Sequence, residues 1–336
     1  MNHEKVTSRA HHRPGGGFRN PWPSAQVHGF LDFLKWSLIE RRRNPRRPDP
    51  DPSTFPRSVP SYVHPRAAPE MFTASWVGHT SFLLQLGGLN ILLDPVWGDR
   101  ASPVSFAGPR RRVPAAIAFD QLPPVDAVCL SHDHYDHLDT PTIKRLVARY
   151  PAIQWYGPLG VGNYLRKHGA TSVIEHDWWE TSALGGVEFT ALPAQHFSGR
   201  SLGNRNQTLW CGWAIRSAAH SVFFAGDTAL HPEFDVIGRK CGPFDVAILP
   251  IGAYEPRWFM SSVHMNPEDA LGAFGQLHAH QNGRTLRFLA SHWGTFKLTD
   301  EPMDEPPHRL RALWRASTFD EEQLWILKHG ETRTIR

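Results

Sequence analysis

Short apolar runs separated by polar turns recur along the chain from residue 72 onward. Runs of roughly four to eight residues, bounded by Gly, Pro or charged residues, are typical of β-strands. Gly87 and Gly88 stand between two of these runs and predict a tight hairpin turn. The runs predict strands over 72–77, 81–86, 89–94, 125–131, 187–192, 208–216, 221–226, 244–251 and 286–290.

Helical periodicity fills several of the intervals between these runs. Apolar residues three and four positions apart predict helices over 141–150, 159–168, 266–279 and 305–316. Because strands and helices alternate, the fold class is α/β. Two blocks of strands, each followed by helices, predict two sheets packed face to face with helices outside them, a four-layer αββα sandwich.

The first 70 residues differ from the rest in being rich in Pro, Gly and Arg, which predicts an N-terminal arm over 1–70 and one folded domain over 71–336. Within the arm, apolar residues at helical spacing predict an amphipathic helix over 27–39, and five arginines follow it between 41 and 47. This combination favours peripheral contact with an anionic membrane surface. Packing on the protein's own core, or on a second copy of the chain in a homodimer, is the alternative.

Composition narrows the class of protein further. Lys and Arg number 36 against 32 for Asp and Glu, so the net charge of +4 does not favour a nucleic-acid partner. Cys129, Cys211 and Cys241 form no CxxC pair, which argues against a thiolate zinc site or a disulfide framework and indicates a cytoplasmic location. We expect no membrane-spanning helix, because no run reaches ~20 apolar residues.

Four potential metal ligands crowd into six positions directly after the apolar run 125–130. Residues two apart point the same way in an extended chain, so His132, His134 and Asp136 can converge, and a turn can return His137 to them. Four ionisable groups behind a buried strand would be costly to desolvate without a cation. Imidazole and carboxylate are zinc ligands, so the spacing predicts donors for two metal ions.

Three later residues are candidates for the remaining ligands, since zinc takes about four donors. His196, Asp227 and His292 each end an apolar strand-like run. Taken singly, a histidine or aspartate at a strand end is more often a cap or an ordinary hydrogen-bonded group than a metal ligand. Because the cluster at 132–137 already favours a metal site, a role as metal ligands is favoured for all three residues.

The HxHxDH pattern, followed by a distant His, a Gly-Asp-Thr and a Ser-His, resembles the signature of the metallo-β-lactamase superfamily. Within it, the chain resembles the N-acylphosphatidylethanolamine-hydrolysing phospholipases D. The matching segments are Asn20–Pro23, Trp76–Thr80, Ser131–Asp139, Phe223–Thr228, Pro250–Met260, His292–Phe296 and Leu327–Glu331.

The resemblance implies a metallo-β-lactamase fold and two zinc ions per chain. It implies that a hydroxide between the ions attacks the phosphorus of N-acylphosphatidylethanolamine-type lipids, releasing N-acylethanolamine and phosphatidic acid. Tyr135 and His264 would lie near the substrate head group; the residue before His264 is Val263, where mammalian members commonly have glutamine. The implied ligands are His132, His134 and His196 for one ion, Asp136, His137 and His292 for the other, and Asp227 as the bridge.

Several alternatives stay open at this point. His264 could instead cap the helix that starts at Asn266, and His79 is interpreted as an outer-shell group. A lactonase or small-phosphoester hydrolase of the same fold is the alternative enzyme. A non-catalytic metal-binding module is the alternative from another class. A nuclease is disfavoured, because the interval from Gly212 to His292 leaves no room for a nucleic-acid-clamping domain. The segment around Tyr254 to Trp258 is interpreted as a structural loop.

Overall fold

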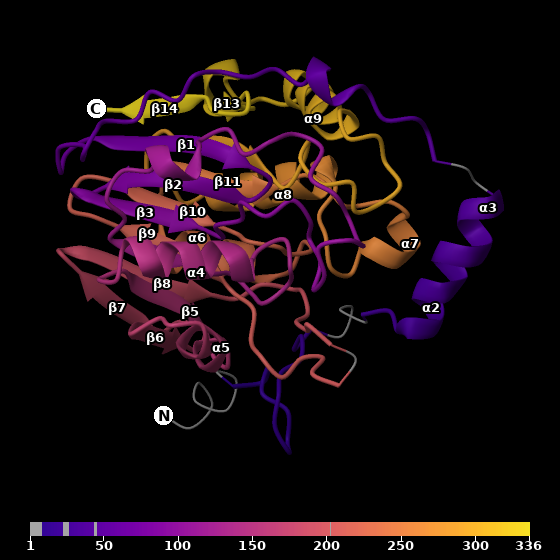
Figure 1. Ribbon diagram of the computed structural model, residues 1–336. Helices are drawn as coiled ribbons and strands as arrows, with labels where there is room; N and C mark the ends of the chain where they lie inside the picture. The colour runs from indigo at the N-terminus through magenta and orange to yellow at the C-terminus, as the bar shows by residue number, and fades with distance from the viewer. Residues whose placement is uncertain (1–8, 23–26, 44–45, 202) are drawn as a thin grey trace.

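The computed structural model describes residues 9–22, 27–43, 46–201 and 203–336. In these residues, two seven-stranded sheets face each other (Figure 1). The first sheet runs β14-β1-β2-β3-β4-β5-β6 and the second β13-β12-β11-β10-β9-β8-β7. The first contains β1 (Phe72–Gly78), β2 (Ser81–Leu86), β3 (Leu89–Leu93), β4 (Ala127–Cys129), β5 (Gln154–Pro158), β6 (Ser172–His176) and β14 (Thr332–Ile335). The second contains β7 (Thr181–Leu184), β8 (Val187–Leu192), β9 (Gly212–Arg216), β10 (Ser221–Phe224), β11 (Val246–Pro250), β12 (Arg287–Ser291) and β13 (Leu324–Trp325).

Helices cover the outer face of each sheet, which confirms the predicted four-layer αββα sandwich. Helices α4 (Thr140–Arg149) and α5 (Gly162–Lys167) cover the first sheet. The helices on the second sheet are α6 (Glu233–Cys241), α8 (Pro267–His278) and α9 (Glu305–Arg315). Short elements between them are η2 (Pro52–Thr54), η3 (Phe119–Gln121), α7 (Arg257–Met260) and η4 (Glu321–Gln323).

The alternation of side chains along each strand explains why the first sheet is apolar on both faces. Phe82 and Leu84 of β2 belong to the core between the sheets, whereas Leu83 between them packs with Ile143 and Leu146 of α4. A sheet covered on both sides gives continuous apolar runs rather than an apolar-polar alternation. The predicted hairpin is confirmed: Gly87 and Gly88 adopt φ angles of 59° and 78°, which favour glycine at both positions.

Several elements were not predicted from the apolar pattern. Strand β6 is partly exposed and carries Ser172, Glu175 and His176, so it lacks a clear apolar period. In α6, Gly238 interrupts the helical signal. A Cβ atom there would lie 2.8 Å from Cδ2 of His280, so glycine permits the close approach of this helix to the neighbouring chain segment.

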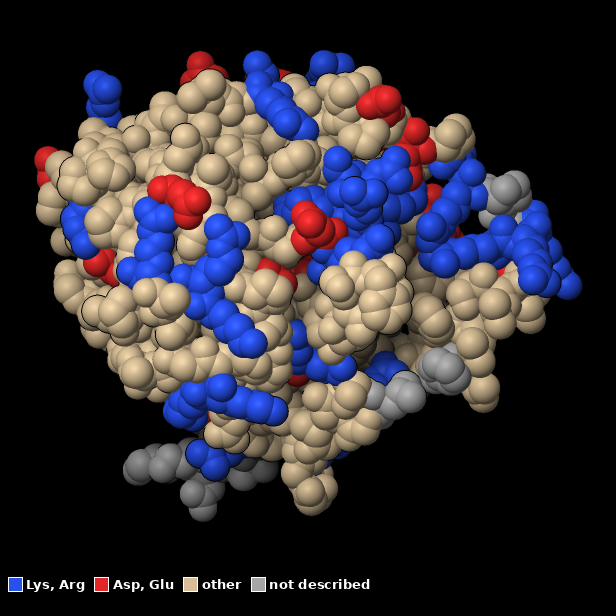
Figure 2. Space-filling model, in the orientation of Figure 1, with Lys and Arg blue, Asp and Glu red and all other residues tan. Residues whose placement is uncertain are grey.

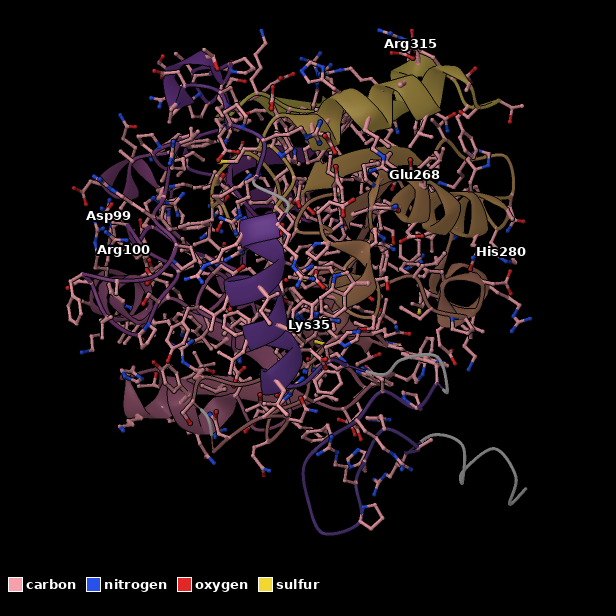
Figure 3. All side chains as sticks on the ribbon, turned by 90° about the vertical axis from the view of Figure 1, so that its right-hand side faces the viewer. Lys35, Asp99, Arg100, Glu268, His280 and Arg315 are labelled. Atoms are coloured by element: carbon pink, nitrogen blue, oxygen red, sulfur yellow. The ribbon has the colours of Figure 1, made fainter. Side chains whose placement is uncertain are left out.

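The helix of the arm begins at Phe30 rather than at Val27. It consists of α2 (Phe30–Leu34), a π-helical segment η1 (Lys35–Glu40) and α3 (Arg41–Arg43). Trp36 is buried against Met260 and Val263, and its Nε1 donates to Asp300 Oδ2 at 2.5 Å. In Figure 3, this helix, with Lys35, lies in front of the body of the molecule.

Other apolar side chains of the arm helix point away from the body of the protein. Leu31 is 79% exposed, and Leu38 and Ile39 are 54% and 48% exposed. The arm helix is short. Within the described ranges, no helix is both long enough and apolar enough to span a bilayer.

Candidate metal centre

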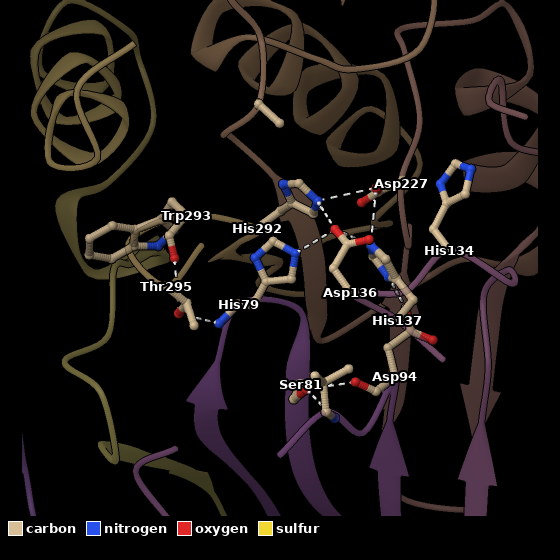
Figure 4. A network of polar contacts seen from close by, with 12 residues as sticks. His79, Ser81, Asp94, His134, Asp136, His137, Asp227, His292, Trp293 and Thr295 are labelled. Carbon is tan, nitrogen blue, oxygen red and sulfur yellow. Dashed lines mark hydrogen bonds and ion pairs between the residues drawn. The ribbon is translucent and has the colours of Figure 1, made fainter. Parts of the chain in front are cut away.

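The chain brings all of the predicted ligands to one edge of the sandwich. Five of them, His134, Asp136, His137, Asp227 and His292, are labelled in Figure 4. The cluster at 132–137 follows β4, and the three later ligands follow β8, β10 and β12. Each side chain therefore sits just past a strand, where the ladder ends and the chain is free to turn. The residues brought together are His132, His134, Asp136, His137, His196, Asp227 and His292.

Three imidazoles form the first half of the centre. His134 Nδ1 lies 2.8 Å from His132 Nε2 and 3.2 Å from His196 Nε2. His132 and His196 are 1% exposed. These three nitrogens point at one another across a space in which a single cation fits.

The second half combines a carboxylate with two imidazoles. Asp136 Oδ2 lies 3.4 Å from His137 Nε2 and 3.5 Å from His292 Nε2. Asp227 stands between the two halves, because its Oδ2 approaches imidazoles of both. The distances from Asp227 Oδ2 are 3.1 Å to His137 Nε2, 3.2 Å to His292 Nε2, 3.8 Å to His196 Nε2 and 3.9 Å to His132 Nε2.

These side chains fit metal ions better than they fit one another. His137 Nε2, His292 Nε2 and Asp227 Oδ1 are buried without a hydrogen-bond partner, although buried polar atoms are usually paired. Zinc binds N and O donors at about 2.0–2.2 Å in a tetrahedron, which places neighbouring ligand atoms roughly 3.3 Å apart. The spacing between the candidate ligand atoms, from 2.8 to 3.9 Å, spans that value.

The electrostatics of the two halves differ. Burial lowers the pKa of His134 to about 4 and that of His196 to about 3, so both rings are neutral at neutral pH, the form that binds metals. Burial also disfavours the charged form of His292, but Asp227 and Asp136 outweigh it and raise its pKa to about 9. Burial alone would raise the pKa of Asp227, yet His137 and His292 hold it well below its usual range. The second half therefore attracts positive charge, which divalent cations supply.

An outer layer of hydrogen bonds orients the ligands, and its principal carboxylate, Asp94, was not predicted from the sequence. Asp94 Oδ2 lies 2.7 Å from His137 Nδ1, and its Oδ1 accepts the backbone N–H of Ser131 at 2.7 Å. Ser131 Oγ in turn lies 2.9 Å from His132 Nδ1. The sequence did carry a signal for Asp94, because Asp94 ends the apolar run 89–94 just as Asp227 follows the apolar run 221–226.

His79, interpreted from the sequence as an outer-shell group, lies beside Asp136 and belongs to a group with Asp136, His137 and His292 that could hold a metal ion. Its Nε2 lies 2.9 Å from Asp136 Oδ2, and it is 1% exposed. Its φ of 56° is unusual for a residue with a side chain, and three backbone contacts hold this conformation. The backbone N–H donates to Thr295 Oγ1 at 2.7 Å (Figure 4). The carbonyl accepts the N–H of His292 at 3.1 Å and the indole N–H of Trp76 at 2.9 Å.

The two predicted substrate-contact residues line the same centre. His264 Nδ1 lies 4.0 Å from Asp227 Oδ2, and burial lowers the pKa of His264 to about 3. The alternative role as a helix cap is wrong, because Asn266 caps α8 by accepting the N–H of Asp269. The hydroxyl of Tyr135 donates to the carbonyl of Arg200 at 2.6 Å, which leaves the ring to line the space above the centre.

The loop from Tyr254 to Trp258 serves mainly to hold neighbouring segments. Arg257 Nη1 donates to the carbonyl of His264 at 3.1 Å, and Tyr254 donates to Glu305 Oε1 at 2.8 Å. Trp258 Nε1 donates to Glu40 Oε2 at 2.7 Å, which ties the loop to the arm helix.

A cavity of about 520 Å³ opens onto the centre. His134, Asp136, Asp227 and His264 form its polar end. Its walls are largely apolar and come from both the arm and the domain. They include Val27, Phe33, Trp36, Phe197, Phe259, Met260, Val263 and Leu298.

Comparisons with known proteins agree with this geometry. Residues 89–293 match the family described as "Beta-lactamase superfamily domain". The N-acyl-phosphatidylethanolamine-hydrolyzing phospholipase D 1 of Caenorhabditis elegans is 42% identical over 254 residues, covering 72% of this chain and 70% of that protein. The mitochondrial enzyme of the same name from Saccharomyces cerevisiae is 31% identical over 249 residues, covering 71% of this chain and 51% of that protein.

Solved structures share the fold at low sequence identity. A metallo hydrolase of Ignicoccus hospitalis is 21% identical with a TM-score of 0.57, covering 79% of this chain and 99% of that one. An isothiocyanate hydrolase from Delia radicum gut bacteria is 19% identical with a TM-score of 0.59, covering 78% of this chain and 98% of that one.

Fold, site and comparisons together define a metal-dependent hydrolase of the metallo-β-lactamase fold. Within the β-lactamase superfamily, the chain belongs to the family of the N-acylphosphatidylethanolamine-hydrolysing phospholipases D.

Proposed function

We propose that this protein is a phospholipase D that hydrolyses N-acylphosphatidylethanolamine-type lipids to N-acylethanolamine and phosphatidic acid, using two zinc ions. The observation that carries the proposal is the apolar cavity that ends on two facing groups of metal ligands. The names of the nematode and yeast relatives state the same substrate.

The residues of the chain have distinct tasks in this reaction. When bound, zinc ions lower the pKa of a water molecule toward neutrality and neutralise charge on phosphate oxygens. Water then adds to phosphorus, the bond from phosphorus to the ethanolamine oxygen breaks, and that oxygen takes up a proton. Asp136 and Asp227 keep the centre anionic and so favour cations. The neutral ring of His264 lies beside Asp227, where it can hydrogen-bond the head group.

The apolar walls of the cavity account for a lipid rather than a small polar substrate. Phe33 and Trp36 from the arm face the same space as Phe259 and Met260 from the domain. Burying an acyl chain there gains about 0.8 kcal/mol for each methylene. A lactone or a small phosphoester would leave these walls largely unused.

The proposal is tested with a panel of substrates, each with and without a chelator. The panel contains N-acylphosphatidylethanolamine, phosphatidylethanolamine, phosphatidylcholine, a lactone and a small phosphodiester. We expect hydrolysis of the N-acylated lipid to exceed that of the others and to stop on chelation. Faster turnover of the lactone or of the small phosphodiester would contradict the lipid assignment and support the alternative hydrolase.

His264→Gln is expected to lower kcat on the preferred lipid about 100-fold, the lower end of the range for a group that assists proton transfer. Zinc content should stay that of the native protein if His264 acts on the substrate. A loss of zinc would instead assign His264 to the metal, because it also forms a potential ligand group with His196 and Asp227. Steady-state kinetics combined with metal analysis checks both points. Unchanged turnover would remove His264 from the mechanism.

We further propose that the arm helix meets an anionic lipid surface at the cytoplasmic face of a membrane. Leu31, Leu38 and Ile39 are exposed, and the exposed Arg42 and Arg43 follow them. Figure 2 shows Lys and Arg side chains gathered over this end of the helix, on the right of the view. The same helix supplies a wall of the cavity, so a lipid surface in contact with it would lie close to the cavity.

Combining Leu31→Ser with Leu38→Ser is expected to weaken binding to anionic vesicles at least about tenfold, because each leucine loses its apolar transfer energy. Sedimentation with vesicles measures the effect, and Val59→Ser, at a residue that is 86% exposed outside this helix, is the control. Turnover of a short-chain monomeric substrate should not change, since neither leucine lines the cavity. Equal binding of the double variant and the native chain would contradict the membrane role.

A further inference from the structure

One side chain of the N-terminal arm hydrogen-bonds both backbone polar groups of a candidate metal ligand. Asn20 Nδ2 donates to the carbonyl oxygen of His196 at 2.8 Å. Its Oδ1 accepts the backbone N–H of the same residue at 3.2 Å. Asn20 therefore pairs with both main-chain polar groups of His196, as a neighbouring strand does in a sheet ladder.

We infer that Asn20 is a positioning residue for the metal ion held by His132, His134 and His196, so that the arm completes the metal centre. The inference rests on the metal-binding part of the proposed function and is independent of the lipid substrate.

His196 needs such a partner because of where it lies in the fold. The pairing between β8 and β9 ends at Leu192, four positions before His196, yet His196 is only 1% exposed. Buried N–H and C=O groups are costly to leave unpaired. A planar side-chain amide, found only in Asn and Gln, carries a donor and an acceptor side by side, as the backbone of a neighbouring strand does. The side chain of Asn20 therefore takes the place of the strand that is missing beside His196.

The ring of His196 is fixed at its other end. Its Nδ1 lies 2.9 Å from the carbonyl oxygen of Val263, which directs Nε2 toward His134. With the backbone held by Asn20 and the ring held by Val263, the direction of Nε2 is set before a metal binds. Such outer partners typically change metal affinity about 10- to 100-fold when removed.

The arm is seated firmly enough to place Asn20. The N–H of Phe18 donates to the carbonyl of Asn206 at 2.8 Å, and Gly17 permits this approach, since a Cβ there would lie 2.6 Å from the same oxygen. Two histidines of the arm contact the carboxylate of Asp177. Nε2 of His11 lies 2.6 Å and Nε2 of His12 lies 2.7 Å from its oxygens.

Aromatic stacking secures the other side of Asn20. The ring of Trp22 stacks on His231 at 4.7 Å and on Trp178 at 5.8 Å, measured between centroids. Contacts therefore flank Asn20 in sequence on both sides, which restricts its side chain to the position beside His196.

The test is chelator competition on the full chain loaded with zinc, with no substrate present. Asn20→Ala removes both contacts, whereas the isosteric Asn20→Asp keeps the acceptor and loses the donor. Arg19→Ala is the matched control, because Arg19 is exposed and its Nε donates only to the carbonyl of Ala10 among the contacts described. We expect about 10- to 100-fold weaker retention of one zinc ion in Asn20→Ala. Asn20→Asp, which sets a carboxylate oxygen against the carbonyl oxygen of His196, should retain zinc no better than Asn20→Ala.

Thermal unfolding of the metal-free proteins separates positioning from general stability. A purely structural role would lower the metal-free Tm and leave zinc affinity unchanged, which would overturn the inference. Zinc retention within twofold of native in Asn20→Ala would also overturn it, as would an equal loss in Arg19→Ala. If Asn20→Ala does not fold, Asn20→Asp decides by the same criteria. A native chain that binds no zinc would overturn this inference and the proposed function together.

Discussion

Asp227→Asn is expected to lower hydrolysis of the N-acylated lipid more than about 100-fold, beyond the range seen when only an outer-shell partner is lost. The reason is position, because Asp227 Oδ2 lies 3.1 Å from His137 Nε2 and 3.8 Å from His196 Nε2, so that one oxygen serves both halves of the centre. The substitution removes the negative charge that lies between the two groups of ligands. We therefore also expect at least one metal ion to be lost.

Turnover and metal content of the purified variant measure both effects. Asp235→Asn is a suitable control, because Asp235 lies eight positions further along the chain with a side chain that is 51% exposed. Activity of Asp227→Asn within tenfold of native, with metal retained, would contradict the bridging role.

Asp94→Ala is expected to destabilise the metal-free protein by about 3 kcal/mol, as does removing one partner of a buried charged pair. Asp94 and His137 are both 0% exposed, and their side chains meet at 2.7 Å. The change also leaves the buried N–H of Ser131 without its acceptor. The same variant should hold zinc about 10- to 100-fold less tightly, because the ring of His137 loses its orienting partner.

Urea unfolding and chelator competition measure these two consequences separately. Asp99→Asn, five positions away at an exposed site, controls for the loss of an acidic residue. A free energy of unfolding within 1 kcal/mol of native would show that the pair contributes little to the fold.

The candidate metal ligands could be proposed from the sequence because their signal is local. Four ionisable residues directly after one buried strand would be costly to bury without a cation, and the three later ligands each end an apolar run. The four-layer sandwich could be predicted for a similar reason, since β2 and β11 are buried along their whole length and stand out as apolar runs.

Elements at the margins of the sheets gave weaker signals. β7 and β14 are edge strands with exposed positions, so their sequences carry little apolar pattern. β5 lies inside the first sheet, between β4 and β6, but it ends in Gly157 and Pro158, residues that are depleted in strands. These strands are recognised only from the neighbouring strands with which they pair in the folded protein.

The amino-acid sequence by itself determined which residues are candidates to bind metal and which segments are apolar enough to form the two sheets, because both depend on residue type and short-range spacing. Only the tertiary structure decided that Asn20 reaches His196 across 176 positions and that Trp36 of the arm forms a wall of the cavity. Such contacts depend on how distant segments pack. Burial then leaves specific polar groups in need of partners, and no local pattern in the sequence encodes which segment will supply them.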